Sequence, residues 1–549
     1  MAALAGLLSA CSAAHGDATS RIARPGAVAG RILTLAIGRP ASVDPANSFE
    51  QWGRLVDSLI CEPLIQIDPV TGDPKPAIAQ SWIVSANGTK LTLKLRKGLH
   101  FSDGRSVTAD DVAYSLSRVA SEEQASNVAD LLRPVFGWEE VHGDVEPKTP
   151  EHATQLAGVG VVGTDAVQLS LSAPRADFYR VLAEPLSAPV PRAAVTKDPS
   201  AFEANPVCAG PYKLVHPWDP GDASISLARF EGYYGRNTGY ARGGRGYADR
   251  IELHVLDPSD APSEVAAGRA DAALLQASIA PRGTRVVTNT TPYLEYIGLP
   301  VTVPPFERRE VRIALSQAID RAAIARDVYG RVRAPAGGFL APSLGAMSRR
   351  NACGPAAPAT QNVIAARRTL EGAGIDLMER NITMSYNPDF QNRSLVEAVA
   401  RQWESAFGLH VALRSLPWSR YLEAGTAPRG FDGAFRLGWK PTYAGPDPAL
   451  APLFTSANIG RDNMTRFNDP RFDRILDRTA RKATSEEDLR NAYQRLEDIL
   501  CEQMPAIPVV FGGARAVVSD RIGTASGSFF DITSGSLDVR EIYVRTAAG

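Results

Sequence analysis

The chain has 549 residues, of which 44% are hydrophobic and 22% are charged. This is the balance of a folded globular protein, and the length is too great for one small core, so two or three domains are expected. The formal net charge of −1 gives no reason to expect nucleic acid or an acidic membrane surface as a partner. No apolar run reaches the roughly 20 residues that a membrane-spanning helix needs.

The N-terminus has the pattern of an export signal. Residues 1–8 are apolar and run into Leu8-Ser9-Ala10-Cys11, which resembles a bacterial lipobox, where the cysteine is cleaved free and lipid-modified. The alternative is a misplaced start with a chance cysteine, because a signal peptide carries a basic segment and none precedes Cys11. We expect the true start to lie upstream, Cys11 to be lipidated, and residues 1–30 to form signal and flexible tether. The protein would then be extracytoplasmic, anchored by lipid to the outer face of the cytoplasmic membrane in the periplasmic space.

The first half of the chain predicts strands separated by turns, with few helices. A helix follows the first strand and runs through Leu55 and Leu59. The expected strands are 32–37, 166–171, 250–256 and two within 211–229, and a short helix is expected at 263–271.

The segment 91–119 combines four local signals. Leucines at every second position from residue 91 to 95 predict a half-buried strand, and Asp103-Gly104 predicts a turn. Thr108 can cap a helix and Asp111 can complete a capping box, before apolar residues at helical spacing. A metal site at Asp103, Asp110 and Asp111 is disfavoured, because the turn and the cap explain each carboxylate.

The second half is more helical. Helices are expected at 308–328, with one break in its apolar face, and at 361–373, 395–407 and 484–500. Strands are expected at 382–386, 410–413 and 506–511. This alternation predicts an α/β domain whose sheet is covered on both faces.

Four cysteines remain besides Cys11. No Cys-x-x-Cys or Cys/His spacing indicates zinc. In an exported protein two disulfides are expected, with three possible connectivities. We favour Cys61–Cys208 with Cys353–Cys501, because each pair then lies within one half of the chain, and the other two connectivities stay open.

Catalysis is not expected. The sequence lacks a Gly-x-Ser-x-Gly elbow, a His-Glu-x-x-His motif and a Gly-x-x-x-x-Gly-Lys-Ser/Thr loop. Its seven histidines show no paired spacing on one face. No metal site and no cofactor are therefore predicted, and a hydrolase is the least favoured function.

A series of short motifs resembles one protein family. Pro76-Ala-Ile-Ala-Gln-Ser-Trp82, Phe101-Ser-Asp-Gly104 and Thr108-Ala-Asp-Asp-Val112 are similar to the signature region of the family 5 solute-binding proteins of ABC importers, the extracytoplasmic peptide- and nickel-binding proteins. Later motifs follow in the same order: Ala209-Gly-Pro-Tyr212, Gly268-Arg-Ala-Asp271, Val311-Arg-Ile-Ala-Leu315, Ala318-Ile-Asp-Arg321 and Gly438-Trp439. The resemblance covers roughly residues 32–545.

The resemblance implies a bilobal α/β periplasmic-binding-protein fold of type II, cluster C, with an extra domain and two lobes joined by a hinge. By analogy, domain II spans 61–172 and domain III spans 292–508. Domain I is then discontinuous, with segments 31–60, 173–291 and 509–549.

The resemblance also implies a cleft between the lobes. In peptide-binding members, backbone hydrogen bonds hold an extended ligand as an added strand. Leu437, Gly438 and Trp439 match the strand that pairs with the peptide, and Arg436 matches a position that can meet a ligand carboxylate. A surface salt bridge is the alternative for Arg436. Trp418 matches a cleft tryptophan, for which a core position is the alternative.

Two positions near the expected cleft depart from the family pattern. Peptide-binding members usually have an aspartate where this chain has Thr442, which Tyr443 follows, and Asp447 is displaced from that register. Arg39 stands where the family often has an acidic or neutral residue. A buried ammonium without an acid would lose a charge-assisted bond worth roughly 1.5–3 kcal/mol. Free-amine peptides are therefore expected to bind weakly.

The function expected from the resemblance is capture of di- or oligopeptides and delivery to an ABC permease and its ATPase. The alternative within the family is a non-peptide solute such as haem or a metal complex. We expect a monomer that performs no chemistry on its ligand.

Overall fold

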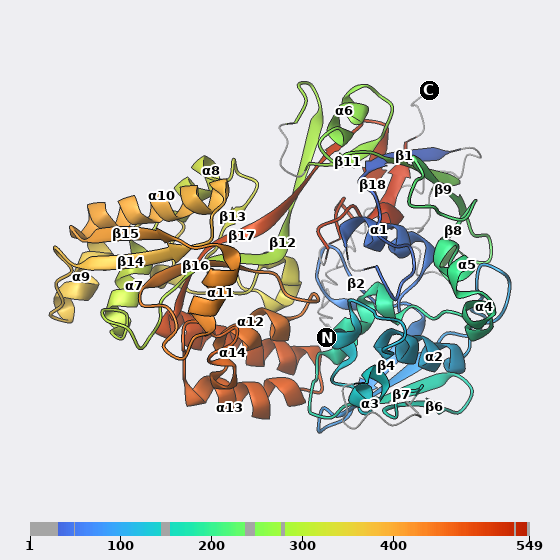
Figure 1. Ribbon diagram of the computed structural model, residues 1–549, viewed down its shortest axis with the longest axis horizontal. Coiled ribbons are helices and arrows are strands. Elements are labelled where there is room, and N and C mark those ends of the chain that lie inside the picture. The colour runs from blue at the N-terminus through green and yellow to red at the C-terminus, as the bar shows by residue number, and fades with distance from the viewer. Residues whose placement is uncertain are drawn as a thin grey trace, which may run out of the picture.

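The computed structural model describes residues 31–48, 50–143, 154–236, 248–275, 280–531 and 534–545. The expected lipidation site Cys11 and the segment 1–30 lie outside these ranges. Among the described residues, no helix is long and apolar enough to cross a membrane. The chain forms two lobes, and its N-terminal and C-terminal segments belong to the same lobe (Figure 1).

The upper part of the first lobe is half of a large sheet. Its strand β1 (Ile32–Ile37) pairs in parallel with both β10 (Arg250–Val255) and β11 (Ala272–Leu274), and its alternate residues are buried in one core. The other elements here are α1 (Gln51–Ile60), α4 (Arg192–Lys197), α5 (Pro199–Ala204), β8 (Tyr212–Leu214), β9 (Ser224–Arg229), α6 (Ala261–Ala266), β18 (Ile522–Thr524) and β19 (Ile542–Val544).

The lower part of the first lobe has its own sheet and core. The sheet order is β4–β5–β7–β6, and α2 (Ala109–Ala120) packs on it. The helix begins at the expected capping box, in which Thr108 and Asp111 bond each other's backbone amides. The elements are β2 (Ile65–Ile67), β3 (Pro74–Pro76), β4 (Ala79–Val84), β5 (Lys90–Leu95), α3 (Trp138–His142), β6 (Val159–Val162) and β7 (Ala166–Ser170).

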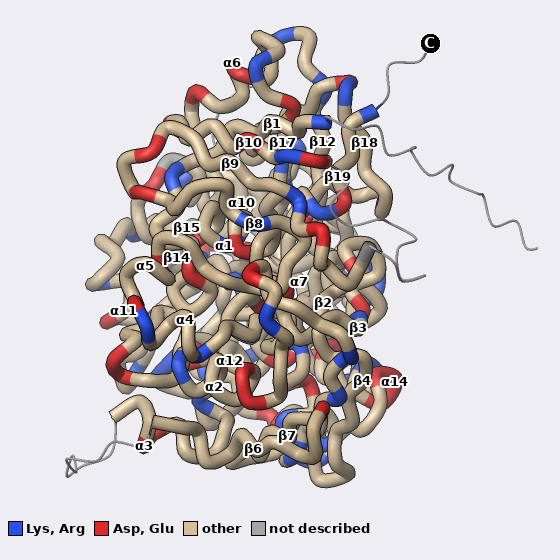
Figure 2. The backbone as a smooth tube through the Cα atoms, turned by 90° about the vertical axis from the view of Figure 1, so that its right-hand side faces the viewer, with Lys and Arg blue, Asp and Glu red and all other residues tan. Residues whose placement is uncertain are grey.

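Acidic and basic residues are interspersed over this lobe without a large region of one sign (Figure 2).

The core of the lower part includes residues from Leu64 to Leu186, which extends beyond the end of domain II expected at residue 172. The domain boundaries therefore stay a proposal.

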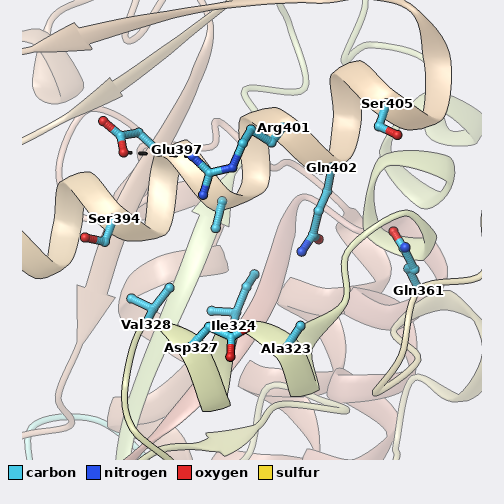
Figure 3. Close-up of a pocket in the computed structure, with 11 residues that line it drawn as sticks. Ala323, Ile324, Asp327, Val328, Gln361, Ser394, Glu397, Arg401, Gln402 and Ser405 are labelled. Carbon is cyan, nitrogen blue, oxygen red and sulfur yellow. Dashed lines mark ion pairs between the residues drawn. The ribbon is translucent and has the colours of Figure 1, made fainter.

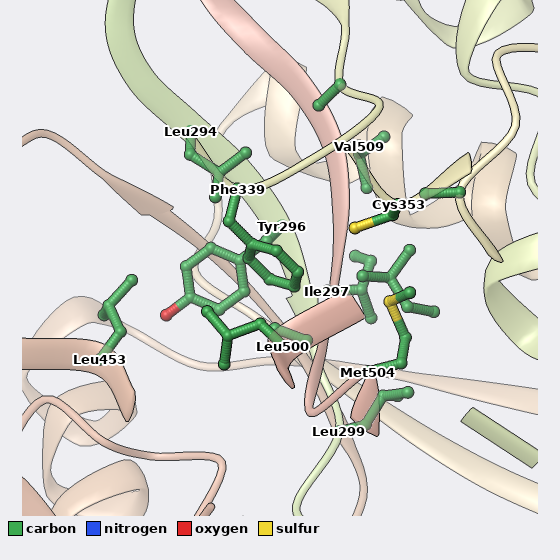
Figure 4. Packing of buried hydrophobic residues seen from close by; sticks show 14 of the residues in the cluster. Leu294, Tyr296, Ile297, Leu299, Phe339, Cys353, Leu453, Leu500, Met504 and Val509 are labelled. Atoms are coloured by element: carbon green, nitrogen blue, oxygen red, sulfur yellow. The ribbon is translucent and has the colours of Figure 1, made fainter. Parts of the chain in front are cut away.

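The second lobe is an α/β layer around the other half of the large sheet. Its core includes Leu294, Tyr296 and Phe339 (Figure 4). The strands are β13 (Ala334–Pro335), β14 (Asn381–Tyr386), β15 (His410–Ser415) and β16 (Ala434–Trp439). The helices are α7 (Arg309–Gln317), α8 (Arg321–Asp327), α9 (Val363–Gly372), α10 (Phe390–Phe407), α11 (Trp418–Thr426), α12 (Pro446–Phe454), α13 (Pro470–Arg478) and α14 (Glu486–Gln503).

Two long antiparallel strands connect the lobes. These are β12 (Arg285–Gly298) and β17 (Ala506–Val518), which pass from one lobe to the other (Figure 1). Their register shifts between Thr290 and Leu294, where Pro292 has no amide hydrogen to donate. Gly513 is the register partner of Thr290 and lies at the edge of this interruption. The ladder is therefore weakest where the lobes meet, which is the position of a hinge.

Disulfides join Cys61 to Cys208 and Cys353 to Cys501. This is the connectivity that we favoured from the sequence.

Residues 308–328 form two helices, α7 and α8, because the Asp320 carboxylate caps a new helix there. The helix expected at 263–271 begins and ends earlier, at Ala261–Ala266.

The lobes also touch on the side away from the hinge strands. Arg180 of the first lobe pairs with Glu486 of α14 at 3.0 Å, and Tyr179 donates to the same carboxylate. Burial, and then the carboxylates of Asp73 and Asp177, raise the pKa of Glu486 from its ordinary 4.5 to about 7.

Substitution of Gly513 by alanine tests the close approach at the hinge. The added Cβ would lie 1.8 Å from the carbonyl oxygen of Val332, and a backbone atom can move only with its whole segment. We expect the free energy of unfolding in urea to fall by about 1–3 kcal/mol. In the control Gly160→Ala, the Cβ meets no atom within 4 Å, so a loss as large as that of Gly513→Ala would contradict the steric cause.

The raised pKa of Glu486 predicts a pH-dependent stability. A carboxyl whose pKa is higher in the folded state contributes stability that is present below pH 4.5 and is lost as the pH rises through about 7. The midpoint of urea unfolding should therefore fall as the pH rises from 4.5 to about 7, the interval between the unfolded and the folded pKa. Glu486→Gln should flatten this slope, and an unchanged slope in that variant would assign the dependence to another group.

Candidate ligand-binding cleft

The strand β16 has one unpaired edge. On one side it pairs with β12 from Phe435, opposite Gly298, to Trp439, opposite Leu294. On the other side, β14 pairs with it only at Ala434 and Phe435. Beyond these two residues no described strand covers the second edge, although the Arg436 carbonyl accepts from the Tyr421 hydroxyl. Backbone groups from residue 437 to 439 are thus available to an added strand.

Gly438 is required by a close approach on this strand. A Cβ at this position would lie 1.7 Å from the hydroxyl oxygen of Tyr293, so only glycine lets the tyrosine ring lie across the strand. The Tyr293 hydroxyl donates to Glu295 at 2.9 Å and accepts from Arg436 at 3.3 Å. The glycine therefore positions a polar group beside the arginine.

Arg436 belongs to a buried charge network. Its side chain is 8% exposed and pairs with Glu295, which is fully buried and also pairs with Arg333. Its Nη1 donates to Asn387 Oδ1 at 3.1 Å. Burial opposes the charge on Arg436, but the Glu295 carboxylate outweighs burial and raises the pKa. The ion pair is buried, unlike the surface salt bridge considered as the alternative, and the role of Arg436 toward a ligand carboxylate stays a prediction.

Tyr443 and Asp447 contact the first lobe. The Tyr443 hydroxyl donates to Asp177 at 2.7 Å and accepts from Arg175 at 2.9 Å, and the ring packs in the core of the first lobe's lower part. Asp447 lies in the first turn of α12, where Arg175 pairs with it at 3.1 Å and Tyr493 donates to it at 2.7 Å. Burial and the Asp447 carboxylate raise the pKa of Asp177.

The expected aromatic and apolar residues differ in exposure. Trp418 begins α11, is 50% exposed and stacks on Tyr421 with centroids 5.9 Å apart. Trp439 is half-buried and donates from its indole nitrogen to the Pro448 carbonyl at 2.7 Å. Leu437 is buried. Of these side chains, Trp418 is the most exposed to solvent.

Thr442 is exposed just beyond the strand, close in sequence to Lys440. Lys440 also meets solvent, yet loss of surrounding water and then the charge of Arg54 lower its pKa, with Glu184 and Asp531 acting in the opposite direction. These three residues belong to the first lobe, where Arg54 pairs with Glu184. Charged residues of both signs from the two lobes therefore lie near one another around Lys440.

Arg39 lies apart from these residues. Its guanidinium donates to the carbonyl oxygens of Pro220 and Asp222, in the turn between β8 and β9 of the first lobe. The structure gives Arg39 a local structural role, and its expected part in ligand binding stays untested.

Two pockets that are open to solvent lie away from the cleft residues. A cavity of about 450 Å³ separates α8 from α10, where Glu397 pairs with Arg401 at 4.0 Å (Figure 3). A second cavity of about 590 Å³ lies beside the hinge strands. Neither is lined by Trp418, Gly438 or Trp439. In this arrangement of the lobes, the expected ligand position is therefore not one of these two cavities.

Sequence reasoning missed the acidic partners in the cleft. Glu295 stands within the apolar run Tyr293-Leu-Glu-Tyr-Ile-Gly298, and a charge inside such a run predicts a buried ion pair. Asp177 and Arg175 had no comparable signal, since both lie in a polar connection. The residues that they contact in the second lobe can be identified only from the tertiary structure.

Comparison with known proteins gives the family. Residues 73–461 match the pattern described as "Bacterial extracellular solute-binding proteins, family 5 Middle". The probable deoxycholate-binding periplasmic protein YgiS of Escherichia coli (strain K12) is 25% identical over 484 residues, 86% of each chain. Heme-binding protein A of Haemophilus influenzae is 25% identical over 482 residues, and the oligopeptide-binding protein OppA of Escherichia coli is 25% identical over 488 residues. Each of these two alignments covers 84% of this chain and 83% of the relative.

Solved structures share the fold. The murein tripeptide binding protein MppA in its unliganded open form has a TM-score of 0.80 at 22% identity, covering 94% of this chain and 98% of that one. HbpA2 from Haemophilus parasuis has a TM-score of 0.78 at 18% identity, covering 94% and 100%. These likenesses confirm the bilobal periplasmic-binding-protein fold. Together with the family match across both lobes, they show that the chain belongs to family 5 of the extracellular solute-binding proteins, the binding components of ABC importers.

Proposed function

We propose that the protein captures a peptide or a peptide-like solute between its lobes and delivers it to an ABC permease. The observation that carries this proposal is the unpaired edge of β16, which β14 leaves after Phe435. An extended ligand can add to such an edge through backbone hydrogen bonds that do not depend on its side chains. The membership in family 5 supports the same role.

The charges around this edge favour a carboxylate on the ligand. Arg436 and Arg333 share the single carboxylate of Glu295, so the local net charge is positive. A guanidinium holds a carboxylate well because two N–H groups can fork onto its two oxygens. Trp418 offers an exposed ring for an apolar group. The ligand class supported best is therefore a small solute with a carboxylate and an apolar part.

A non-peptide solute is the second candidate. Thr442 replaces the acid that would hold a peptide ammonium, and the acids Asp177 and Asp447 nearby are already paired. Two similar proteins are named for deoxycholate and heme. Both candidates use the same cleft, and they differ in whether an amino group is recognised.

Capture would proceed by closure of the lobes. The TM-score is 0.80 against an open, unliganded relative and 0.58 against Haemophilus influenzae OppA in complex with a peptide, which supports an open state here. A ligand that contacts both lobes stabilises the closed state by its differential affinity. Loss of water on closure strengthens each polar contact. Lipidation at Cys11 would hold the monomer beside its permease.

Native mass spectrometry of protein purified from its own host tests the proposal. We expect one small solute per chain, and small-angle scattering should show a smaller radius of gyration for the loaded protein than for the emptied one. Release of a chemically altered solute would indicate an enzyme instead. A loaded protein as extended as the empty one would contradict capture by closure.

Substitution of Thr442 by aspartate tests the missing ammonium site. An added charge-assisted bond is worth roughly 1.5–3 kcal/mol, so a free-amine peptide should bind about 10- to 100-fold more tightly. Calorimetry with one peptide, free and N-acetylated, measures the difference. The control Thr196→Asp places the same charge on an exposed helix of the first lobe and should change neither affinity. If the wild-type protein already prefers the free amine, the interpretation of Thr442 is wrong.

A further inference from the structure

The cavity beside the hinge is the strongest unassigned site. It has a volume of about 590 Å³, and its walls come from β12, α8, the turn that follows α8, and β13. The residues that line it are Thr288, Asn289, Thr290, Ala322, Ala325, Arg326, Arg331, Val332, Arg333, Ala334 and Pro335. It lies outside the group of residues that border the ligand edge of β16.

Positive charge predominates in this cavity. Arg326 pairs with Asp327 at 2.7 Å and Arg333 pairs with Glu295. Arg331 is exposed and makes no ion pair with a described residue, although it helps Arg326 to lower the pKa of Asp327. Three arginines thus line the cavity, whereas Asp327 and Glu295, the carboxylates that pair with two of them, do not line it. Because Glu295 is shared with Arg436, the charge of the cavity stays positive.

The opposite wall adds groups that suit an oxyanion. Thr288 and Thr290 can donate from their hydroxyls. Arg515 of β17 is the register partner of Thr288, and paired residues point to the same face of a sheet. Arg515 therefore lies on the same face of the ladder as Thr288, although it does not line the cavity. Arginine guanidinium groups, which can donate two hydrogen bonds at once, and hydroxyl groups are the hydrogen-bond donors that phosphate groups prefer.

The cavity spans the hinge. Thr288 precedes the register shift of β12, on the first-lobe side, whereas Arg331 and Arg333 belong to the second lobe. An anion held by both walls would connect the lobes across the interruption at Pro292. Arg333 also reaches the cleft network through Glu295, so an occupant would compete with Glu295 for this arginine.

We propose that this cavity binds a phosphate-type oxyanion and thereby forms a second ligand site at the hinge. The site does not depend on the identity of the solute in the cleft. The same phosphate chemistry could come from a dissolved molecule or from a phospholipid headgroup. Both sources would use Arg331 as the arginine that has no ion pair in the described structure.

Calorimetry with inorganic pyrophosphate tests the site in phosphate-free buffer at low salt. The intact protein should bind one pyrophosphate, Arg331→Gln should weaken binding at least tenfold, and added salt should weaken it further. A parallel sedimentation assay uses vesicles of phosphatidylglycerol. Arg331-dependent binding to vesicles alone would identify a headgroup as the source, and binding of pyrophosphate alone would identify a dissolved ligand.

The matched control is Arg269→Gln, which removes an exposed, ion-paired arginine outside the cavity. It should leave binding unchanged. Arg326→Gln is a second cavity variant, and thermal unfolding establishes that each variant is folded. The proposal is overturned if neither pyrophosphate nor vesicles bind, or if Arg331→Gln and Arg269→Gln weaken binding equally.

Discussion

The antiparallel ladder between β12 and β17 is the constraint on which the whole molecule depends. These strands extend the sheet of the first lobe through β11 and that of the second lobe through β16. The ladder is continuous from Arg285 to Thr290 in the first lobe, is interrupted from Thr290 to Leu294, and shifts register once more between Glu295 and Tyr296 in the second lobe. Pro292 cannot donate a hydrogen bond there, so rotation between the lobes breaks few hydrogen bonds of the ladder itself. The cleft is consequently set beside the most deformable part of a stiff sheet.

Buried charges on the two sides of the cleft have different roles. The pair of Arg436 with Glu295 lies within the second lobe, whereas Arg175 with Asp447 connects the lobes. Replacing a buried ion pair by apolar residues is often neutral for stability, because desolvation offsets the attraction. These pairs therefore contribute mainly to orientation. Arg175 and Tyr443 hold the end of the cleft strand in register with the first lobe, independently of the hinge.

Local structure could be predicted from the sequence where one signal dominates. The capping box of Thr108 and Asp111, the strand 32–37 and the helices of the second half have clear periodicity or capping residues. The hinge strand β12 was not predicted, because its polar residues and Pro292 are atypical of a central strand. Cleft residues were predicted only through family resemblance. Partners such as Asp177, which lies far from Tyr443 in the sequence, depend on tertiary contacts that no local pattern encodes.

An unpaired strand edge normally promotes association with other chains, and proteins cover such edges or keep them short. In β16 the unpaired edge is limited to a few residues, since β14 covers Ala434 and Phe435 and the chain leaves the strand after Trp439. The side chain of Arg436 reaches from this edge to Asn387, just before α10. A second protein strand would thus find too little backbone to pair with, whereas a short ligand would find enough. Under the proposed function, the length of the edge would favour small extended solutes before any side chain of the ligand is recognised.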